Sequence, residues 1–224
     1  MKTTLRILLA DDHQMFRDAL RSLLEVAHCT KSFCIEVVAE TGDGLEVVNL
    51  ARSSLPDIVC MDIGMPGMNG IEATRRLLAA CPGVKVIAVS AFIEQHYVLD
   101  MLDAGAMAYV TKAGSSDELL RAIEAVRSDK KYLCPLIANV VANALSGLGV
   151  VKSKSPGQLG ARERQVLQMV AEGETSIKIG IRLNISPATV EVHRRNIMRK
   201  LNMHSVAEVT RYAINNGISP QATN

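Results

Sequence analysis

Reactive side chains recur in this sequence at the ends of short apolar runs. Asp62 is the most informative of them, because it follows the apolar run 58–61 and precedes Gly64 and Pro66, which break regular structure. The same kind of position is held by Asp11 and Asp12 after residues 5–10, by Ser90 in residues 84–91, and by Lys112 after residues 108–111. If these runs are neighbouring parallel strands, all of these side chains meet at one edge of a sheet.

Such a group of side chains is suited to phosphoryl chemistry. Converging carboxylates repel one another, and a bound divalent cation removes that repulsion. Oxygen ligands open to solvent favour Mg²⁺, which takes one or two carboxylates and keeps several waters. An aspartate beside the ion can attack phosphorus and form an acyl phosphate, while the cation and a lysine neutralise the oxygens. Each acid alone would be a solvated strand end, but the ordered positions together favour a reactive site.

The elements that would hold these side chains alternate along the first 130 residues. The β-rich runs are residues 5–10, 35–39, 58–61, 84–91 and 108–111, and a helix-length segment separates each from the next. Strands that alternate with helices predict an α/β domain with a doubly wound parallel sheet. In such a sheet the ligand site lies at the carboxyl ends of the strands, where the strand order reverses.

Length and charge both divide the chain into two parts. A length of 224 residues corresponds to about two domains. Residues 1–145 carry 14 lysines and arginines against 18 aspartates and glutamates, a net charge of −4, whereas residues 146–224 carry 11 against 5, a net charge of +6. This asymmetry indicates that only the second part meets nucleic acid.

The alternation of strands and helices stops after Tyr132. One more helix is expected at residues 135–145, and the Gly, Ser and Lys of residues 146–158 are typical of a linker. Every segment from Leu159 onward has helical character. The predicted organisation is an α/β domain at residues 4–130, an extra helix and linker at 131–158, an all-α four-helix domain at 159–217, and a flexible tail at 218–224.

Two short helices in the basic half have the spacing of a helix-turn-helix motif. The first covers residues 175–183, Asn184 and Ile185 make the turn, and the second begins with Ser186 as its cap and Pro187 in its first turn. The second helix of such a motif enters the major groove of DNA. A charged helix alone is usually a solvated surface, but the net charge and the turn spacing favour DNA binding.

Residues 5–130 resemble the receiver domain of a two-component response regulator. The resemblance rests on Leu8-Leu9-Ala10-Asp11-Asp12-His13, residues 61–70, Val89-Ser90-Ala91 and residues 105–112. It implies a flavodoxin-like fold with five strands in the order 2-1-3-4-5. It also implies that Asp62 accepts a phosphoryl group from a sensor histidine kinase, and that Mg²⁺ is held by Asp11, Asp12, Asp62 and the Gly64 carbonyl.

The same resemblance gives roles to three more side chains. Lys112 would contact the phosphoryl group, Ser90 would hydrogen-bond a phosphate oxygen, and Tyr109 would rotate inward as a switch. Taken alone, Tyr109 would be interpreted as a core residue, because buried tyrosines are common. Phe92 has two interpretations: its ring shields the acyl phosphate from water, or it points into solvent or a dimer contact.

Residues 159–217 resemble the DNA-binding domain of NarL/FixJ-type regulators, also called LuxR-type. Arg162-Glu163, Glu172-Gly173, Thr189-Val190 and Lys200-Leu201 are among the residues that carry the resemblance. It implies a motif over residues 176–195, in which Glu191, Val192 and Arg195 face bases and Thr189, Arg194, Arg199 and Lys200 lie nearer phosphates. The family often has lysine in place of Glu191, and a glutamate can instead accept a hydrogen bond from a cytosine amino group.

Two apolar surfaces of the basic half have alternative interpretations. Ile177 replaces a residue that is usually polar or basic in the family, and with Ile181 it forms an apolar pair opposite Ile179. This pair is either a docking surface for the receiver or a second copy, or it packs within the domain. The helix at residues 205–215 is the candidate dimer contact on DNA, although some of its side chains must close the domain.

These features predict a transcriptional regulator that is phosphorylated at Asp62, dimerises and binds double-stranded DNA at two half-sites. The alternative is a constitutive DNA-binding protein with a vestigial pocket, against which the complete set of pocket residues argues. A phosphotransfer or phosphatase enzyme would need a general acid or base two residues after Asp62. Gly64 occupies that position, so we expect a protein that is not an enzyme beyond its own phosphorylation.

Cysteine usage and hydropathy predict a cytoplasmic protein that has no membrane partner. The five cysteines are scattered through apolar segments, which is typical of reduced thiols. Cys29 and Cys34 are close in sequence, but no second pair of metal ligands accompanies them. No apolar run reaches about 18 residues, and residues 1–6 lack the core of a signal peptide.

Overall fold

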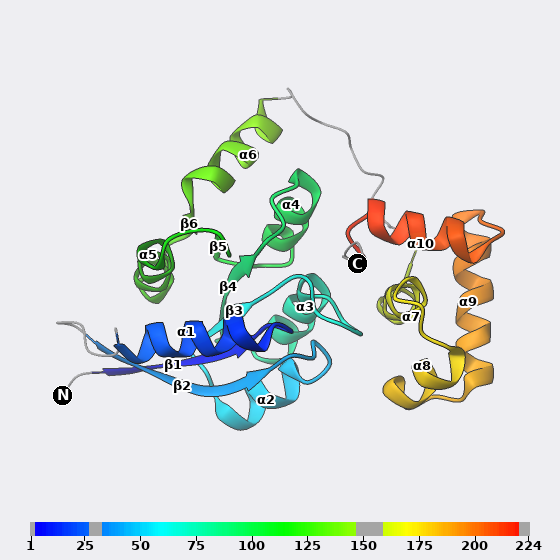
Figure 1. Cartoon of the computed structure of the whole chain (residues 1–224), viewed down its shortest axis with the longest axis horizontal. Coiled ribbons are helices and arrows are strands. Elements are labelled where there is room, and N and C mark those ends of the chain that lie inside the picture. The colour runs from blue at the N-terminus through cyan, green and yellow to red at the C-terminus, as the bar shows by residue number, and fades with distance from the viewer. Residues whose placement is uncertain (1–2, 27–32, 147–158, 220–224) are drawn as a thin grey trace. The chain divides into compact units, whose positions relative to one another are not determined.

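The chain forms two compact units in a computed structural model that describes residues 3–26, 33–146 and 159–219 (Figure 1). The first, here called the α/β unit, ends with helix α6, and the second, the helical unit, begins with helix α7. Cys29, most of the expected linker and residues 220–224 of the expected tail lie outside the described residues. None of the described helices is long and apolar enough to cross a membrane.

The α/β unit is built on a parallel sheet of six strands in the order β2-β1-β3-β4-β5-β6. The strands are β1 (Thr3–Ala10), β2 (Phe33–Thr41), β3 (Ile58–Met61), β4 (Lys85–Ser90), β5 (Ala108–Thr111) and β6 (Tyr132–Leu133). The expected order 2-1-3-4-5 is confirmed, but the expected number of five strands is wrong. The sixth strand joins the edge through the amide of Tyr132, which donates to the Met107 carbonyl. Two residues are too few to show a strand period in the sequence.

Helices cover both faces of this sheet, as the doubly wound arrangement requires. The helices of the unit are α1 (Gln14–Val26), α2 (Val47–Ser54), α3 (Gly70–Ala80), α4 (Gln95–Asp103), α5 (Ser116–Arg127) and α6 (Pro135–Leu145). On one face, Leu24 of α1 and Ile123 of α5 share a buried core with Ile7 and Ile87 of the sheet. The intervening strand residues, such as Leu8, point to the other face, where α2, α3 and α4 pack side by side.

The strand order places a crevice at the carboxyl ends of β1 and β3. The chain leaves β1 to form β2 on one side and then returns to form β3 on the other side of β1. The connections on the two sides therefore diverge, and the loops that follow β1 and β3 leave room between them. These are the loops that carry Asp11, Asp12 and Asp62.

Within residues 159–219, the helical unit contains four helices, α7 (Ala161–Ala171), α8 (Ser176–Leu183), α9 (Pro187–Leu201) and α10 (Val206–Asn215). Three of them begin at a capping side chain that accepts from an amide of the first turn: Thr175 for α8, Ser186 for α9 and Ser205 for α10. Asn184 takes the left-handed conformation that ends α8. Helix α8, the turn and helix α9 therefore form the expected helix-turn-helix.

The burial of side chains in the helical unit decides between the interpretations of its apolar surfaces. Ile179 is fully buried, but Ile177 and Ile181 on the same helix are 64% and 76% exposed. The interpretation that this apolar pair packs within the domain is therefore wrong. In α10, Val209 and Ala213 are buried and close the core, while Val206 is 47% exposed. The chain stays ordered beyond α10, because the amides of residues 218 and 219 both donate to the Ala213 carbonyl.

Candidate phosphorylation pocket and nucleic-acid interface

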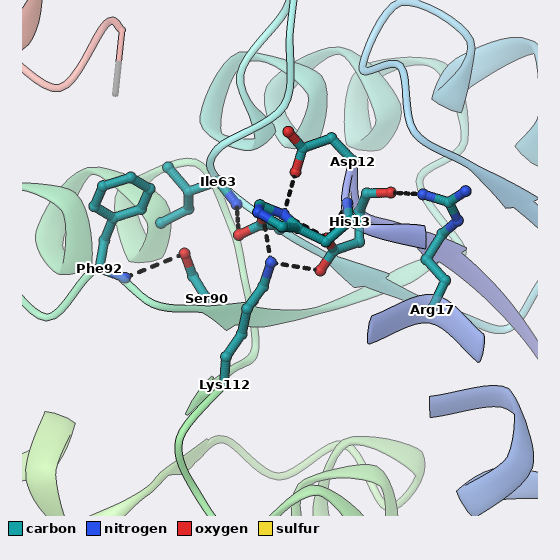
Figure 2. A network of polar contacts seen from close by, with 9 residues as sticks. Asp12, His13, Arg17, Ile63, Ser90, Phe92 and Lys112 are labelled. Carbon is teal, nitrogen blue, oxygen red and sulfur yellow. Dashed lines mark hydrogen bonds and ion pairs between the residues drawn. The ribbon is translucent and has the colours of Figure 1, made fainter. Parts of the chain in front are cut away.

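The strand-end side chains of the α/β unit converge on one ammonium group (Figure 2). The Lys112 Nζ lies 2.7 Å from Asp11 Oδ2 and 2.9 Å from Asp62 Oδ2. Both carboxylates are 3% exposed as residues, whereas Asp12 at the rim is exposed. The structure therefore brings three of the predicted residues, from three separate strand ends, into direct contact.

Backbone hydrogen bonds fix the loops that carry these side chains. The Asp62 amide donates to the Ala10 carbonyl at 2.8 Å, and the Lys112 amide donates to the Ser90 carbonyl at 2.9 Å, so the strand pairing continues past the strand ends. The carboxylate of Asp62 is oriented by the Ile63 amide, which donates to Oδ1 at 2.7 Å. These bonds hold the second oxygen, Oδ2, toward the ammonium of Lys112.

Burial and charge act against each other in this pocket. Burial raises the pKa of Asp11, and the nearby charge of Asp62 raises it further, while the hydrogen bond from Lys112 opposes both effects. Burial alone would lower the pKa of Lys112, but the two carboxylates outweigh burial and hold this pKa above its usual value. The raised pKa of Lys112 keeps its ammonium protonated beside the carboxyl groups of Asp11 and Asp62.

The donor set of the pocket fits a hard divalent cation. Ligand atoms of Asp11, Asp12, His13 and Asp62 all lie within 4.8 Å of one another. Carboxylate oxygens at a solvent-open rim suit Mg²⁺, which retains several waters. Gly64 also lines this space, since a Cβ at that residue would lie 3.5 Å from Asp62 Oδ2.

Two pocket residues were not predicted from the sequence. The His13 Nδ1 lies 2.6 Å from Asp12 Oδ1, so the imidazole occupies the rim beside the carboxylates (Figure 2). Arg17, one turn into α1, donates to the backbone carbonyl of Asp11. The sequence places both residues near the acidic pair, because His13 directly follows that pair and Arg17 lies four residues after His13, in α1. Neither the proximity of the imidazole nor that of the guanidinium follows from sequence spacing alone.

Ser90, Phe92 and Tyr109 form a connected group at the end of β4. The Tyr109 hydroxyl donates to the Phe92 carbonyl at 2.6 Å, and the Phe92 amide donates to Ser90 Oγ at 3.4 Å. Tyr109 is completely buried, and this burial raises the pKa of its phenol well above the usual value. The phenol is therefore neutral and a hydrogen-bond donor.

The Phe92 ring is half-buried and lies beside Gly64 and Tyr97. A Cβ on Gly64 would lie 3.3 Å from this ring, and the ring centroid is 4.4 Å from that of Tyr97. Burial raises the pKa of Tyr97 to about 12. That this ring shields the acyl phosphate stays a prediction.

Helix α9 presents a mixed polar face suited to the major groove. Val190 and Ile197 are buried and fix the helix in the domain, whereas Glu191, Val192 and Arg195 are exposed. Among the residues that the structure describes, Arg195 has no polar partner, so its guanidinium is available for a ligand. Thr189 lies at the start of the helix, with its hydroxyl 2.8 Å from that of the cap Ser186.

The remaining basic residues of α9 have partners within the domain. Arg194 Nη1 donates to Ser176 Oγ at 3.0 Å, and Arg199 donates to Asn196 Oδ1 at 3.0 Å. Lys200 donates to Glu163 Oε2 of α7 at 2.7 Å. A phosphate contact by Lys200 remains a prediction and requires that its ammonium be shared with Glu163.

The α/β unit with its acidic pocket and the helical unit with its exposed recognition helix together define a receiver domain joined to a helix-turn-helix DNA-binding domain. Residues 7–124 match the response regulator receiver domain, and residues 157–213 match the bacterial regulatory proteins of the luxR family. The chain therefore belongs to the LuxR-type response regulators. The resemblance inferred from the motifs is confirmed, and the protein is a DNA-binding response regulator.

Two curated relatives match this chain over nearly its whole length, and a solved structure matches part of it. The chain is 34% identical over 215 residues to the response regulator UvrY of Escherichia coli strain K12, covering 96% of this chain and 95% of UvrY. It is 36% identical over 214 residues to the transcriptional regulatory protein LiaR of Bacillus subtilis strain 168, covering 95% and 98%. A solved two-component response regulator of the LuxR family from Aurantimonas sp. SI85-9A1 is 35% identical, covers 64% of this chain and 99% of that chain, and has a TM-score of 0.59.

Proposed function

We propose that Asp62 is the residue that accepts a phosphoryl group, supplied by a sensor histidine kinase. The observation that carries this proposal is the pairing of a buried aspartate with Lys112 at 2.9 Å, directly beside the Asp11 carboxylate. A carboxylate oxygen of Asp62 attacks phosphorus, the new O–P bond forms, and the P–N bond of the phosphohistidine breaks. The leaving imidazole takes up a proton as it departs.

The surrounding side chains stabilise the transferred group. Lys112 contacts one phosphoryl oxygen with its ammonium, and the Ser90 hydroxyl donates to another. Asp11, Asp12, Asp62 and the Gly64 carbonyl would hold Mg²⁺, which neutralises negative charge on the phosphoryl oxygens when bound. As Ser90 moves toward the phosphoryl group, Tyr109 rotates inward, and its hydroxyl gives up the hydrogen bond to the Phe92 carbonyl. This rotation is the switch.

Phe92 sets the lifetime of the phosphorylated state in this proposal. Its ring lies against Gly64, next to the Asp62 carboxylate, where it restricts the approach of an in-line water. We expect the acyl phosphate to persist for longer than minutes, and Phe92→Ala to shorten this lifetime. Decay of the radiolabelled protein measures both, with Ile93→Ala as a neighbouring control. A half-life of seconds in the unmodified chain would show that the ring does not shield the bond.

The phosphorylated chain would dimerise and place two α9 helices on DNA. Glu191, Val192 and Arg195 would face base edges, while Thr189, Arg194, Arg199 and Lys200 would lie nearer phosphates. The exposure of Glu191, Val192 and Arg195 on one helix supports their availability to DNA. One helical unit neutralises few phosphates, and pairing multiplies affinity through effective concentration.

Intact-protein mass spectrometry after incubation with Mg²⁺ and a small acyl phosphate tests the acceptor directly. The unmodified chain should gain the mass of one phosphoryl group, and Asp62→Ala should gain none. Asp57→Ala is a matched control, because this exposed aspartate precedes the same strand at its opposite end. A phosphoryl group on Asp62→Ala would contradict the proposal by showing that another residue accepts it. No phosphoryl group on the unmodified chain would also contradict the proposal and would favour a constitutive DNA-binding protein with a vestigial pocket.

A further inference from the structure

One carboxylate stands on the face of α9 that is otherwise suited to bind DNA. Glu191 lies in the second turn of the helix, and its side chain is 53% exposed. A negative charge on this face repels the phosphates of DNA and therefore reduces affinity for every sequence. Its presence needs an explanation other than general attraction to DNA.

The carboxylate is held in place by two side chains. Its Oε1 accepts a hydrogen bond from the Ser176 hydroxyl and lies 3.5 Å from Arg194 Nη1, which itself donates to Ser176 Oγ at 3.0 Å. Ser176 is the first residue of α8, where the positive end of the helix favours a negative charge. The three side chains, here called the Glu191 clamp, fix one carboxylate oxygen between the two helices of the motif.

The other carboxylate oxygen remains available to a ligand. Among the residues that the structure describes, Oε2 of Glu191 has no hydrogen-bond or ion-pair partner. An exposed ion pair three residues apart stabilises a helix only slightly, so helix stability alone does not account for the clamp. A carboxylate with one oxygen fixed and one oxygen free is instead an oriented hydrogen-bond acceptor.

An oriented acceptor in the major groove discriminates among bases by chemistry alone. The cytosine amino group donates and matches a carboxylate, whereas the guanine N7 and O6 and the thymine O4 are acceptors that repel it. Adenine also has an amino group, but its N7 acceptor lies beside that donor. A fixed carboxylate therefore favours cytosine and rejects guanine and thymine at the same position.

We propose that Glu191, held by Ser176 and Arg194, selects a cytosine in each half-site of the operator. This inference rests on the proposed docking of α9 in the major groove. In this role Arg194 is a positioning residue for the carboxylate, in addition to any phosphate contact. The discrimination is paid for by weaker binding to DNA in general.

Selection from a random-sequence DNA pool by the full-length phosphorylated chain tests the inference. The unmodified chain should enrich a cytosine at one fixed position of each half-site. Glu191→Gln should lose roughly 5- to 20-fold of its preference at that position, while its affinity for non-cognate DNA rises. Glu191→Lys should change the preferred base to guanine.

Three further variants separate the proposed role from a loss of charge or of folding. Glu191→Asp keeps the charge but shortens the side chain, so it should lose the cytosine preference without gaining affinity for non-cognate DNA. Ser176→Ala releases the carboxylate and should weaken the preference, again without that gain. Asp18→Asn removes one exposed charge from α1 and should leave the selected sequence unchanged. Thermal unfolding confirms that each variant is folded.

The results distinguish this inference from the docking of α9 itself. If the unmodified chain selects no sequence at all, the proposed docking fails. If it selects a sequence and Glu191→Gln enriches the same bases with the same strength, the docking holds and Glu191 does not read a base. An unchanged preference in Ser176→Ala would contradict the clamp.

Discussion

In the pocket of the α/β unit, the Lys112 ammonium contacts two buried carboxylates and its side chain is 15% exposed. On the recognition helix, Arg195 is exposed and has no polar partner among the described residues. In the proposed function the first cation is positioned before the phosphoryl group arrives, because phosphoryl transfer is favoured by charges that do not reorganise during reaction. In the proposed function the second cation is left open for DNA. The proposed function thus uses a cation that is already paired in the pocket and, at Arg195, a cation that the described protein leaves without a polar partner.

Removing the pocket cation should give the largest effect. Lys112→Ala leaves Asp11 and Asp62 without their neutralising partner, so without metal the α/β unit should lose about 3 kcal/mol of unfolding free energy. The extra negative charge should also tighten Mg²⁺ binding, and saturating Mg²⁺ should restore much of the loss. Urea unfolding with and without Mg²⁺ measures both effects. A loss that Mg²⁺ does not reduce would show that electrostatic repulsion is not its cause.

Removing the open cation should affect binding but not folding. Arg195→Ala should weaken binding to the selected operator by about 1 to 3 kcal/mol and relax base preference at one position. Arg199→Ala is the matched control on the same helix, and it should weaken binding to all sequences and reduce the salt dependence by about one counterion. DNA titrations at several salt concentrations distinguish the two. If Arg195→Ala shows the same salt dependence as Arg199→Ala and an unchanged base preference, Arg195 is a phosphate contact and does not read a base.

The Glu163–Lys200 pair combines features of these two cases. Lys200 is a basic residue of α9, as Arg195 is, but its ammonium is paired with a carboxylate, that of Glu163 on α7. Burial opposes the charge of Glu163, but the hydrogen bond from Lys200 and that from the Gly160 amide lower its pKa below 4.5. A carboxylate with a lowered folded-state pKa adds stability at pH values above 4.5, and that stability is lost as the pH falls through the lowered pKa. Glu163→Gln should cost about 1 kcal/mol at neutral pH.

The pH dependence provides the control for this third prediction. The difference in unfolding free energy between the unmodified chain and Glu163→Gln should shrink as the pH falls below 4.5 and through the lowered pKa, because Glu163 is then protonated and as uncharged as the glutamine. Glu124→Gln, at an exposed residue of α5, should show no such dependence. A difference that stays constant at acid pH would mean that packing, not charge, holds α7 to α9.

The sequence predicted the pocket well because its members stand at strand ends. Alternating strands and helices order those ends along the sheet, so Asp11, Asp62 and Lys112 could be brought together without knowing any distance. The sixth strand was missed because two residues show no period. The role of Arg17 was also missed, because its contact depends on how α1 leaves the sheet.

On the recognition helix, the sequence predicted the exposed face but not its internal partners. The caps and the buried stripe follow from spacing along one helix. The contacts of Arg194 with Ser176 and of Lys200 with Glu163 join residues 18 and 37 positions apart. Such pairs depend on how separate helices pack, and a pattern within one helix does not contain that information.

The most direct test of the whole account is the molar mass and operator affinity of the full chain with Mg²⁺ and a small acyl phosphate, compared with Asp62→Ala under the same conditions. The account predicts that phosphorylation doubles the mass of the unmodified chain and tightens its operator binding, while Asp62→Ala stays monomeric and binds weakly. Equal mass and equal affinity in both proteins would contradict the coupling of the pocket to DNA binding.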